Sequence, residues 1–514
     1  MVSKYTKEAG VMDLKKIICI FCILVAASIL ALLVSCQTKD ADGDTKNTGD
    51  MGILDQTDSG GATEQTTEKL VPELPEADYG GHKFTFLAMN DIDGFLINDT
   101  FAQEMNGDVI NDAKYARNIY VEDSYGVKID TVNIGFCKMG SGVSAVKKSA
   151  AAGDFTYDAT ILSAYDTCTL VTEGLLCDLN NMPPLDLSKP WWDQKANEDL
   201  AIKGKMYFTT GDMSPAMKSS TSVMFFNKKH LQDYGLEDPY ALVKSGKWTY
   251  DKLIELSKAV QADLNGDGIF DENDLYGTIA MDDTMMDIVN SIGEKCARIN
   301  SGGEIEVSLY NERVLSVFNK YTDFAYDSTS VFPAQRYAGK VGDYTGIIQF
   351  QNSQSLFFPY GVKLAADMRS METDFGILPF PKLDEGQNRY YSPIIAWWSL
   401  FVSAPALQEN AERTAVILEA LAAESHYGVN AAYYDISLKG KYARDEESSE
   451  MLDIIFDTRI YDFGWYYQIG DYNNVMLNLF RNYNREFTSM YEKNIPKAEK
   501  DVQKINGRFS EILG

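Results

Sequence analysis

Short apolar runs alternate with amphipathic stretches along the first half of the chain. Strand-like runs occur at 82–89, 125–130 and 157–162, and segments with helical spacing lie at 106–124, 143–152 and 170–176. Strands that alternate with helices predict a mostly parallel sheet with helices on both faces. Because ligands of such sheets bind beside the carboxyl ends of the strands, we expect functional residues in the segments that follow them.

A second α/β unit follows the first. Its opening strand is expected at Ser222–Asn227, and the unit extends past the segment 375–381. The apolar run 394–402 is suited to a buried strand, with which the chain would return to the first unit, and an amphipathic helix is expected at 411–424. Residues 431–514 are rich in Tyr, Asp and Leu, and we expect them to form helices that pack back on both units.

An apolar run at 17–34 lies close to the start of the chain. It follows Lys15-Lys16 and ends at Ser35-Cys36, which is the pattern of an export signal whose cysteine becomes the lipid-modified first residue of the mature chain. A start at Met12 would give this signal an ordinary length. The alternative is a transmembrane anchor, because the run lies at the short edge of what spans a bilayer. Both interpretations place the rest of the chain outside the cytoplasm and tie it to the membrane.

Composition limits the function classes. With 47 basic and 75 acidic residues the net charge is −28, and no basic cluster occurs after the signal. We therefore do not expect the protein to bind nucleic acid. An acidic surface of this kind attracts hard cations. Outside the signal the cysteines are too scattered for a disulfide scaffold: Cys137, Cys168, Cys177 and Cys296. Cys168 and Cys177 could form a disulfide bridge, or they could be two buried free thiols, and the sequence does not favour either interpretation.

Several short motifs follow one another in a recognisable order. They are Tyr157-Asp158-Ala159 with Gly174-Leu175-Leu176, the segment 225–231, the segment 248–253, Tyr276-Gly277 and the segment 375–381. Together they resemble the family 1 extracellular solute-binding proteins of ABC transporters, over roughly 83–424. The resemblance implies a monomeric receptor of α/β fold, a two-lobed periplasmic-binding-protein-like clamp that holds a sugar at its hinge and delivers it to ABC permease subunits. The chain departs from the family pattern at Phe226, at His230 and in its long C-terminal extension.

These expectations divide the chain into consecutive parts. They are a lipoprotein signal at 1–35, a disordered tether at 36–78, the first part of lobe 1 at 79–217, lobe 2 at 218–391, a return to lobe 1 at 392–430 and a C-terminal helical extension at 431–514. The tether is assigned because its Asp, Thr, Gly, Glu and Lys residues cannot bury enough apolar area to fold. The protein is therefore expected on the extracellular face of the cell membrane, anchored by lipid on Cys36.

A sugar ring has an apolar face that stacks on aromatic planes and a hydroxyl rim that needs polar partners. Aromatic residues make up 12% of the chain, and the resemblance places these candidates near the ligand: Tyr165, Asp166, Trp191, Asp212, Tyr360 and Trp397. Because adjacent tryptophans on a strand point to opposite faces, Trp192 and Trp398 are assigned to the core. Burial in the core is the competing interpretation for each aromatic residue.

The segment 263–274 matches the calcium loop of EF-hands. Oxygen ligands stand at positions 1, 3, 5, 9 and 12 and a backbone carbonyl at position 7, namely Asp263, Asn265, Asp267, Asp271, Asp274 and Ile269. Gly268 at position 6 allows the sharp turn. We expect a structural Ca²⁺ in this loop, after a helix at 250–262 and with no helix behind it. The alternative is an acidic turn without a metal ion.

Two other function classes compete with a transport receptor. A secreted carbohydrate-active enzyme is disfavoured because the chain has neither a Gly-x-Ser-x-Gly elbow nor a His-Glu-x-x-His helix, and its three histidines are scattered. A non-transport glycan-binding protein or sensor of the same fold stays open. No phosphate-binding Gly-x-x-x-x-Gly-Lys loop is present, so ATP would be used by other chains of the transporter.

Overall fold

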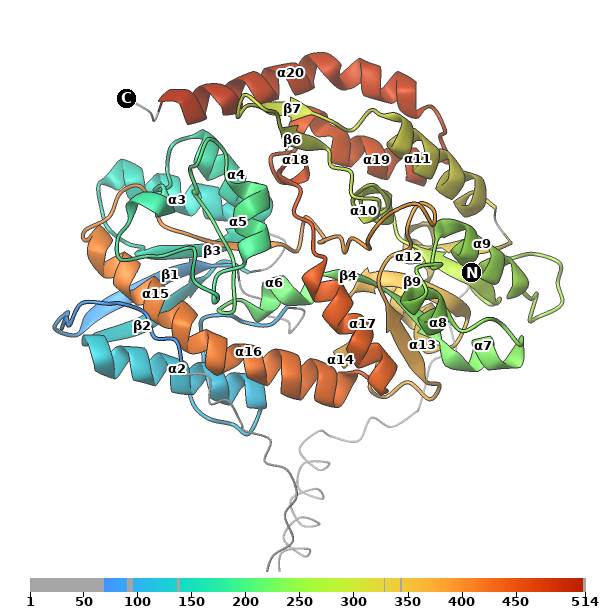
Figure 1. Ribbon diagram of the computed structural model, residues 1–514, viewed down its shortest axis with the longest axis horizontal. Helices are drawn as coiled ribbons and strands as arrows, with labels where there is room; N and C mark the ends of the chain where they lie inside the picture. Colours follow the sequence, from blue (N-terminus) through green and yellow to red (C-terminus); the bar gives the residue numbers. More distant parts are fainter. Residues whose placement is uncertain (1–68, 90–95, 136–138, 328, 343, 512–514) are drawn as a thin grey trace, which may run out of the picture. The chain divides into compact units, whose positions relative to one another are not determined.

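The computed structural model describes residues 69–89, 96–135, 139–327, 329–342 and 344–511. The predicted signal, Cys36 and most of the predicted tether lie outside these residues, and 69–79 has no regular secondary structure beyond a turn. Leu70–Gly514 forms one compact unit that contains two separate main sheets (Figure 1). Each sheet with its covering helices is called a lobe below. In the described part of the chain, no helix combines the length and the apolar character that a membrane span requires.

Lobe 1 is built on a four-stranded sheet in the order β11-β3-β1-β2. The strands are β1 (His82–Ala88), β2 (Val127–Asn133), β3 (Ala159–Ser163) and β11 (Leu400–Ser403). β1 pairs in parallel with β2 and β3, and only β11 is antiparallel. The parallel strands are joined through α2 (Val109–Tyr125) and α3 (Ser141–Ala152), which confirms the predicted alternation. α2 begins at Asp108, whose carboxylate accepts the amides of Ile110 and Asn111 as a helix cap.

Lobe 2 is built on a five-stranded mixed sheet in the order β10-β4-β9-β5-β8. The strands are β4 (Ser222–Asn227), β5 (Tyr276–Ala280), β8 (Val331–Pro333), β9 (Ser355–Gly361) and β10 (Phe375–Leu378). β5 runs parallel to β8 and β9, so the carboxyl ends of these three strands meet at one edge of the sheet. β4 runs antiparallel to β9, and its amino end is therefore at the same edge.

Helices and a small hairpin cover the two sheets. Lobe 1 also has α4 (Ala164–Thr172), η1 (Leu179–Asn181) and α5 (Gln194–Leu200); lobe 2 has α7 (Lys228–Asp233), α8 (Pro239–Lys244), α9 (Tyr250–Ala259), α10 (Thr284–Ser291), α11 (Glu312–Ala325), α12 (Ala334–Val341), α13 (Thr345–Gln351), α14 (Leu364–Asp367) and the hairpin β6–β7 (Ala297–Ile299, Ile305–Val307). Two predicted boundaries are wrong. The helix expected at 170–176 begins at Ala164, directly behind β3, and the helix expected to reach residue 262 ends at Ala259.

Three stretches of chain cross side by side between the lobes, and we call them the crossing segments (214–222, 392–399 and 457–462). The first contains α6 (Pro215–Ser219). Backbone hydrogen bonds join them: the Ser222 amide donates to the Pro393 carbonyl at 2.8 Å, and the Ser392 amide donates to the Thr458 carbonyl at 2.9 Å. The predicted strand at 394–402 is therefore wrong in its first half, because only Leu400–Ser403 pairs with a sheet.

The regular elements that follow β11 in the described chain are all helices, as expected for the C-terminal part. It contains α15 (Ala411–Tyr427), α16 (Val429–Ala431), the π-helix η2 (Ala432–Tyr442), α17 (Glu446–Asp457), α18 (Phe463–Tyr466), η3 (Ile469–Asp471), α19 (Tyr472–Arg481) and α20 (Phe487–Glu511). η2 packs against α2 of lobe 1 and α14 of lobe 2, and α20 packs against α4 of lobe 1 and β7 of lobe 2. The C-terminal helices therefore contact both lobes (Figure 1).

Candidate functional site

Predicted ligand residues from different parts of the chain come together where the lobes meet. Trp397 lies in a crossing segment, and its indole N–H donates to the Asp283 carboxylate of lobe 2 at 3.3 Å. Tyr165 from α4 and Tyr360 from β9 lie close enough to Asp283 for its charge to act on both hydroxyls. We call Tyr165, Asp283, Tyr360 and Trp397 the crossing cluster. Three of its four members were predicted from the sequence as ligand residues.

The Asp283 carboxylate is directed to the lobe boundary and not to its own helix. The residue directly precedes α10, where an aspartate usually caps its own helix, yet its side chain makes no capping hydrogen bond. The carboxylate reaches instead to Trp397 across the lobe boundary. Among the described residues Asp283 is in no ion pair, whereas the neighbouring Asp282 is paired with Arg481. Burial raises the pKa of the Asp283 carboxyl, and the hydrogen bond from Trp397 offsets part of the rise.

The two tyrosines of the crossing cluster lie in a similarly sheltered environment. Burial raises the pKa of Tyr165 to about 12, while the Asn473 side chain beside its hydroxyl acts in the opposite direction. Burial and the charge of Asp283 raise the pKa of Tyr360. Both hydroxyls are therefore neutral donors and acceptors at physiological pH. The arrangement offers aromatic surfaces, one carboxylate and neutral hydroxyls, which is the combination that holds a polyhydroxylated ring.

The second tryptophan of the pair packs behind the cluster. Trp398 is buried, and its ring meets Tyr360 edge to face, with 5.1 Å between ring centroids. It also covers Gly361, where any side chain would overlap the indole. Trp397 by contrast is only partly buried. The structure therefore supports the predicted division, with Trp398 in the core and Trp397 at the boundary between the lobes.

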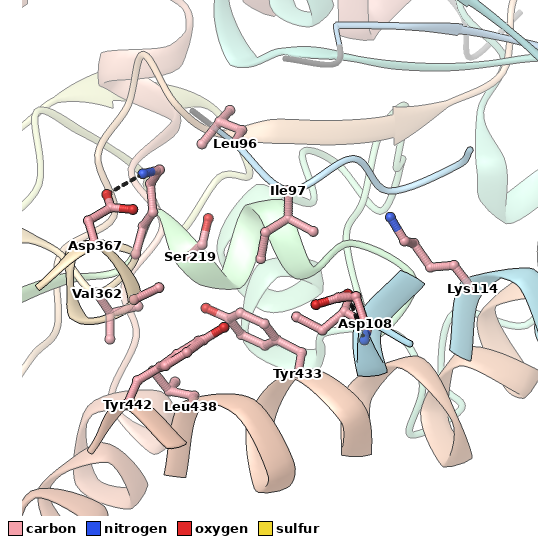
Figure 2. Close-up of a pocket in the computed structure, with 13 residues that line it drawn as sticks. Leu96, Ile97, Asp108, Lys114, Ser219, Val362, Asp367, Tyr433, Leu438 and Tyr442 are labelled. Carbon is pink, nitrogen blue, oxygen red and sulfur yellow. Dashed lines mark hydrogen bonds and ion pairs between the residues drawn. The ribbon is translucent and has the colours of Figure 1, made fainter. Parts of the chain in front are cut away.

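A cavity of about 470 Å³ lies beside the segment that follows β9 (Figure 2). Its walls come from four parts of the chain: the 96–114 region of lobe 1, Ser219 of the first crossing segment, 362–367 of lobe 2 and the helix η2. Val362 in this wall follows Tyr360 by two residues, but among the described residues that line the cavity none belongs to the crossing cluster. The volume is within the range of small-molecule pockets.

Asp166 is a correction to the predicted site. Its side chain is buried, and its two carboxylate oxygens accept the backbone amides of Gly140 at 2.6 Å and Gly142 at 2.9 Å. A side chain at Gly142 would overlap this carboxylate. Asp166 thus fixes the start of α3 against α4 and does not face the crossing cluster.

Trp191 is a second correction, because it lies in the core with an exposure of 0%. Its indole N–H donates to one carboxylate oxygen of Glu419 at 2.9 Å, and the indole of Trp192 donates to the other oxygen at 2.9 Å. The two rings do not alternate between faces because the segment turns here, with the Trp192 amide bonded to the Lys189 carbonyl. Burial raises the pKa of Glu419 to about 7, against the hydrogen bonds that it accepts.

Asp212 is held by basic partners from two elements. Its carboxylate pairs with Lys218 of α6 at 2.6 Å and with His426 of α15 at 2.5 Å. Lys218 is also bonded to Asn430. This network ties the first crossing segment to the C-terminal helices, and the Asp212 carboxylate is engaged by both basic side chains. Asp212 therefore has a structural role beside the crossing and is not a member of the crossing cluster.

The predicted calcium loop closes on itself between α9 and β5. No helix follows it directly, as expected, and the next element is the strand β5. The buried Asp274 accepts the Leu264 amide at 2.9 Å, so the two ends of the loop lie together. Asp263 accepts the amides of Gly266 and Gly268, each at 2.7 Å. Ile269 is exposed. Within the described residues, no group of three or more His, Cys, Asp or Glu side chains is placed to hold a metal ion.

The cysteine question is resolved for the described part of the chain. Cys168, Cys177 and Cys296 are free thiols, and Cys168 and Cys296 are buried. Cys137 lies outside the described residues. The thiols of Cys168 and Cys177 therefore behave as small packing groups.

Sequence reasoning missed Asp283 and Asn473. A signal for Asp283 was present, since Asp282 and Asp283 follow the end of β5, and acidic residues behind a parallel strand are candidate ligand groups. Asn473 is near the start of α19, and nothing in the local sequence indicates that this helix reaches Tyr165.

The fold is shared with many solved proteins, although no family model and no curated protein sequence matches the chain. A cyclo/maltodextrin-binding protein complexed with maltotetraose matches with a TM-score of 0.54 at 14% identity, over 82% of this chain and 97% of that one. An ABC substrate-binding protein from Listeria monocytogenes in complex with cycloalternan matches with a TM-score of 0.52 at 14% identity, over 84% and 99%. The GacH receptor of Streptomyces glaucescens, solved unliganded and with acarbose, matches with a TM-score of 0.51 at 14% identity, over 84% and 98%. This chain therefore has the two-lobed α/β fold of the solute-binding proteins of sugar ABC transporters.

Proposed function

We propose that this protein is a receptor that captures a carbohydrate between its two lobes and delivers it to an ABC permease. The crossing cluster carries the proposal. It places Tyr165, Trp397 and the Asp283–Tyr360 pair, which come from lobe 1, a crossing segment and lobe 2, around one place. A ligand that touches all of them would stabilise the arrangement in which the lobes are closed, a hinge motion of the kind that binding proteins use.

The chemistry of the cluster favours a neutral, hydroxyl-rich ligand. The Asp283 carboxylate accepts one indole N–H and has further lone pairs for ligand hydroxyls. Trp397 and the two tyrosines present apolar ring surface, which a sugar ring covers with its C–H face. The fold supports the same ligand class, because the matched proteins named above were solved with maltotetraose, cycloalternan and acarbose.

A glycan panel tests this proposal. The melting temperature of the protein is measured with mono- and oligosaccharides, since a specific ligand stabilises the folded state by RT ln(1 + [L]/Kd). Asp283→Asn is the matched variant because it keeps the size of the side chain and removes its charge, and we expect its affinity for the stabilising sugar to fall about tenfold or more. Asp323→Asn in α11 is the control. No stabilisation by any sugar, or unchanged binding in Asp283→Asn, contradicts the proposal.

We further propose that the loop 263–274 binds a structural Ca²⁺. The donor set fits a hard cation, because Asp263, Asn265, Asp267, Asp271 and Asp274 supply oxygens and Ile269 supplies a carbonyl. The loop is closed by the Asp274–Leu264 bond, and each carboxylate oxygen that accepts one amide still has a lone pair. The ion would offset the repulsion of the carboxylates and brace the connection from α9 to β5. Chelation should lower the melting temperature of the wild type and leave Asp267→Ala unaffected; an equal effect on both would show that this loop is not the site.

The membrane anchor is also a proposal, and it rests on the sequence alone. Cys36 behind the apolar run 17–34 would carry the lipid, and the tether would link it to the folded unit. Mass spectrometry of native protein extracted from membranes should find Cys36 lipid-modified, and Cys36→Ser should release or misprocess the protein. An unmodified Cys36 in the membrane fraction contradicts the anchor.

A secreted carbohydrate-active enzyme and a non-transport sensor are the competing functions. Cleavage of a bound oligosaccharide by the purified protein would favour the enzyme. Loss of sugar uptake by cells that lack the protein would favour the transport receptor over the sensor.

A further inference from the structure

The long C-terminal helix α20 is attached to both lobes. Its first residue, Phe487, is buried and stacks on Phe318 of α11 in lobe 2, with 5.0 Å between ring centroids. Near the other end Phe509 is also buried, and its ring meets Tyr207 edge to face at 5.2 Å, in the lobe 1 segment that pairs with β11. From Phe487 to Phe509 a helix rises about 33 Å. α20 therefore reaches from one lobe to the other, as Figure 1 shows.

The lobe 2 end of α20 is held by stacked aromatic rings. Tyr491, one turn beyond Phe487, stacks on Tyr310 at 4.8 Å and on Tyr472 of α19 at 5.0 Å between ring centroids. Tyr310, which lies just before α11, also contacts the ring of Phe487. Stacked aromatic pairs contribute stability beyond the area that they bury. This end of the helix is therefore firmly docked on lobe 2.

The lobe 1 end of α20 reaches the surroundings of the crossing cluster. Ile505 is buried and lines the same hollow as Tyr165. One turn further on, the guanidinium of Arg508 lies over Gly174, where a Cβ would overlap it. The helix end and lobe 1 are thus in close contact beside a residue of the candidate site.

Between its two ends α20 has a weak point at Pro496. Proline has no N–H, so the carbonyl of Glu492 lacks its helical hydrogen bond, and the proline ring crowds this carbonyl. Helices bend at such positions. Pro496 is exposed, and on its lobe 1 side the buried Ala498 packs on Gly470 of η3. The two halves of α20 therefore have separate attachments, with the weak point between them.

We propose that α20 is a strap that couples the two lobes, and that it bends at Pro496 when the lobes move about the crossing segments. A straight helix that is fixed at both ends holds its two attachment points at a constant distance. A change of the angle between the lobes therefore has to bend the helix or detach one end. The missing hydrogen bond at Pro496 lowers the cost of bending there. The strap limits how often the lobes separate, and this holds for any ligand that enters between them.

Single-molecule energy transfer tests the strap in the ligand-free, full-length protein. Fluorophores at Lys148 in α3 and Lys229 in α7, which are both exposed, report the distance between the lobes. Phe509→Ala loosens the lobe 1 end and should increase the population with separated lobes about threefold or more. Pro496→Ala restores the helical hydrogen bond, stiffens the strap and should decrease this population. Because Pro496 is exposed, the melting temperature of that variant should be equal to the wild type or higher.

Phe155→Ala is the matched control, because this phenylalanine is exposed in lobe 1. It should give the distance distribution of the wild type. If Phe509→Ala does not fold, Arg508→Ala loosens the same end with less loss of buried surface and should shift the population in the same direction. An unchanged distribution in the loosened variant or in Pro496→Ala overturns the strap, as does an equal shift in Phe155→Ala. These outcomes do not depend on sugar binding and leave the proposed function untouched.

Discussion

Glu419 is the acceptor that holds two tryptophans of the core, and its removal gives a quantitative test of the correction to Trp191. Glu419→Ala leaves the indole N–H groups of Trp191 and Trp192 and the amide of Asp186 without their acceptor. Each buried donor that loses its partner costs about 1–3 kcal/mol. We therefore expect the free energy of unfolding to fall by on the order of 4 kcal/mol, a large single-residue effect.

Glu419→Gln removes the titrating group, and it also replaces one of the two acceptor oxygens with a donor. The pKa of Glu419 is about 7 in the folded protein, against an ordinary value of 4.5. Between these values the folded protein binds a proton that the unfolded chain does not, so lowering the pH through this window raises the free energy of unfolding. The contribution of this group is up to about 3 kcal/mol. Glutamine cannot titrate, so the variant should lack this component of the pH dependence.

Urea unfolding at pH 5 and pH 7.5, followed by tryptophan fluorescence, measures both effects. A loss below about 1 kcal/mol in Glu419→Ala would refute the conclusion that the two indoles depend on this carboxylate. An unchanged pH dependence in Glu419→Gln would refute the assigned pKa.

Two further predictions concern the crossing region. Gly211→Ala should lower the free energy of unfolding by about 3 kcal/mol or more in a thermal or urea melt, because a Cβ would overlap the Trp191 carbonyl oxygen and come to 3.0 Å from the Trp192 Cα. The control Gly339→Ala in α12, which has open space around it, should be neutral or stabilising. Equal effects of the two substitutions would contradict the close approach at Gly211. Burial raises the pKa of Asp212, but Lys218 and His426 outweigh burial and hold this pKa below its ordinary value. Asp212→Asn should therefore lose about 3 kcal/mol at pH 7 and show a weaker fall of stability below pH 4, and a full wild-type acid transition in the variant would contradict the ion pairs.

Much of the fold could be predicted because its strands are short apolar runs that are buried on both faces. β3 and β4 are buried at every position, so their hydrophobic runs identify them without tertiary information. The run 394–402 misled for the same reason. Its first half is apolar because it is enclosed at the crossing, where Ile394 and Ile395 contact the neighbouring segment, and burial there does not require a sheet.

The candidate site was less predictable, because its residues are brought together only by the packing of distant segments. Trp191 and Trp397 are each the first residue of a tryptophan pair, and the pattern of the two pairs does not show which one lies in the core. What separates them is Glu419, 228 residues from Trp191 along the chain, which holds the first pair in the core. Asp283 was missed because its carboxylate lacks the local capping bond that its position suggests, a fact visible only in three dimensions.

The C-terminal helices were expected to pack back on both lobes, and they also line two hollows of the protein. η2 forms one wall of the cavity, while Tyr466 of α18, Gln468 just before η3 and Lys504 of α20 lie around Tyr165. Residues around the candidate site therefore come in part from the segment of the chain with the weakest sequence signals.

The most direct test of carbohydrate binding at the crossing cluster compares Trp397→Ala with Trp398→Ala, scoring melting temperature and sugar affinity in each. Trp397 is partly exposed and bonded to Asp283, so its loss should weaken binding by about 1–3 kcal/mol, at least several-fold in Kd, and leave the fold intact. Trp398 is 1% exposed and packed on Gly361 and Tyr360, so its loss should cost about 3–5 kcal/mol of stability. If instead Trp397→Ala also unfolds the protein, or folds and binds the sugar as tightly as the wild type, the ligand does not bind at the crossing cluster.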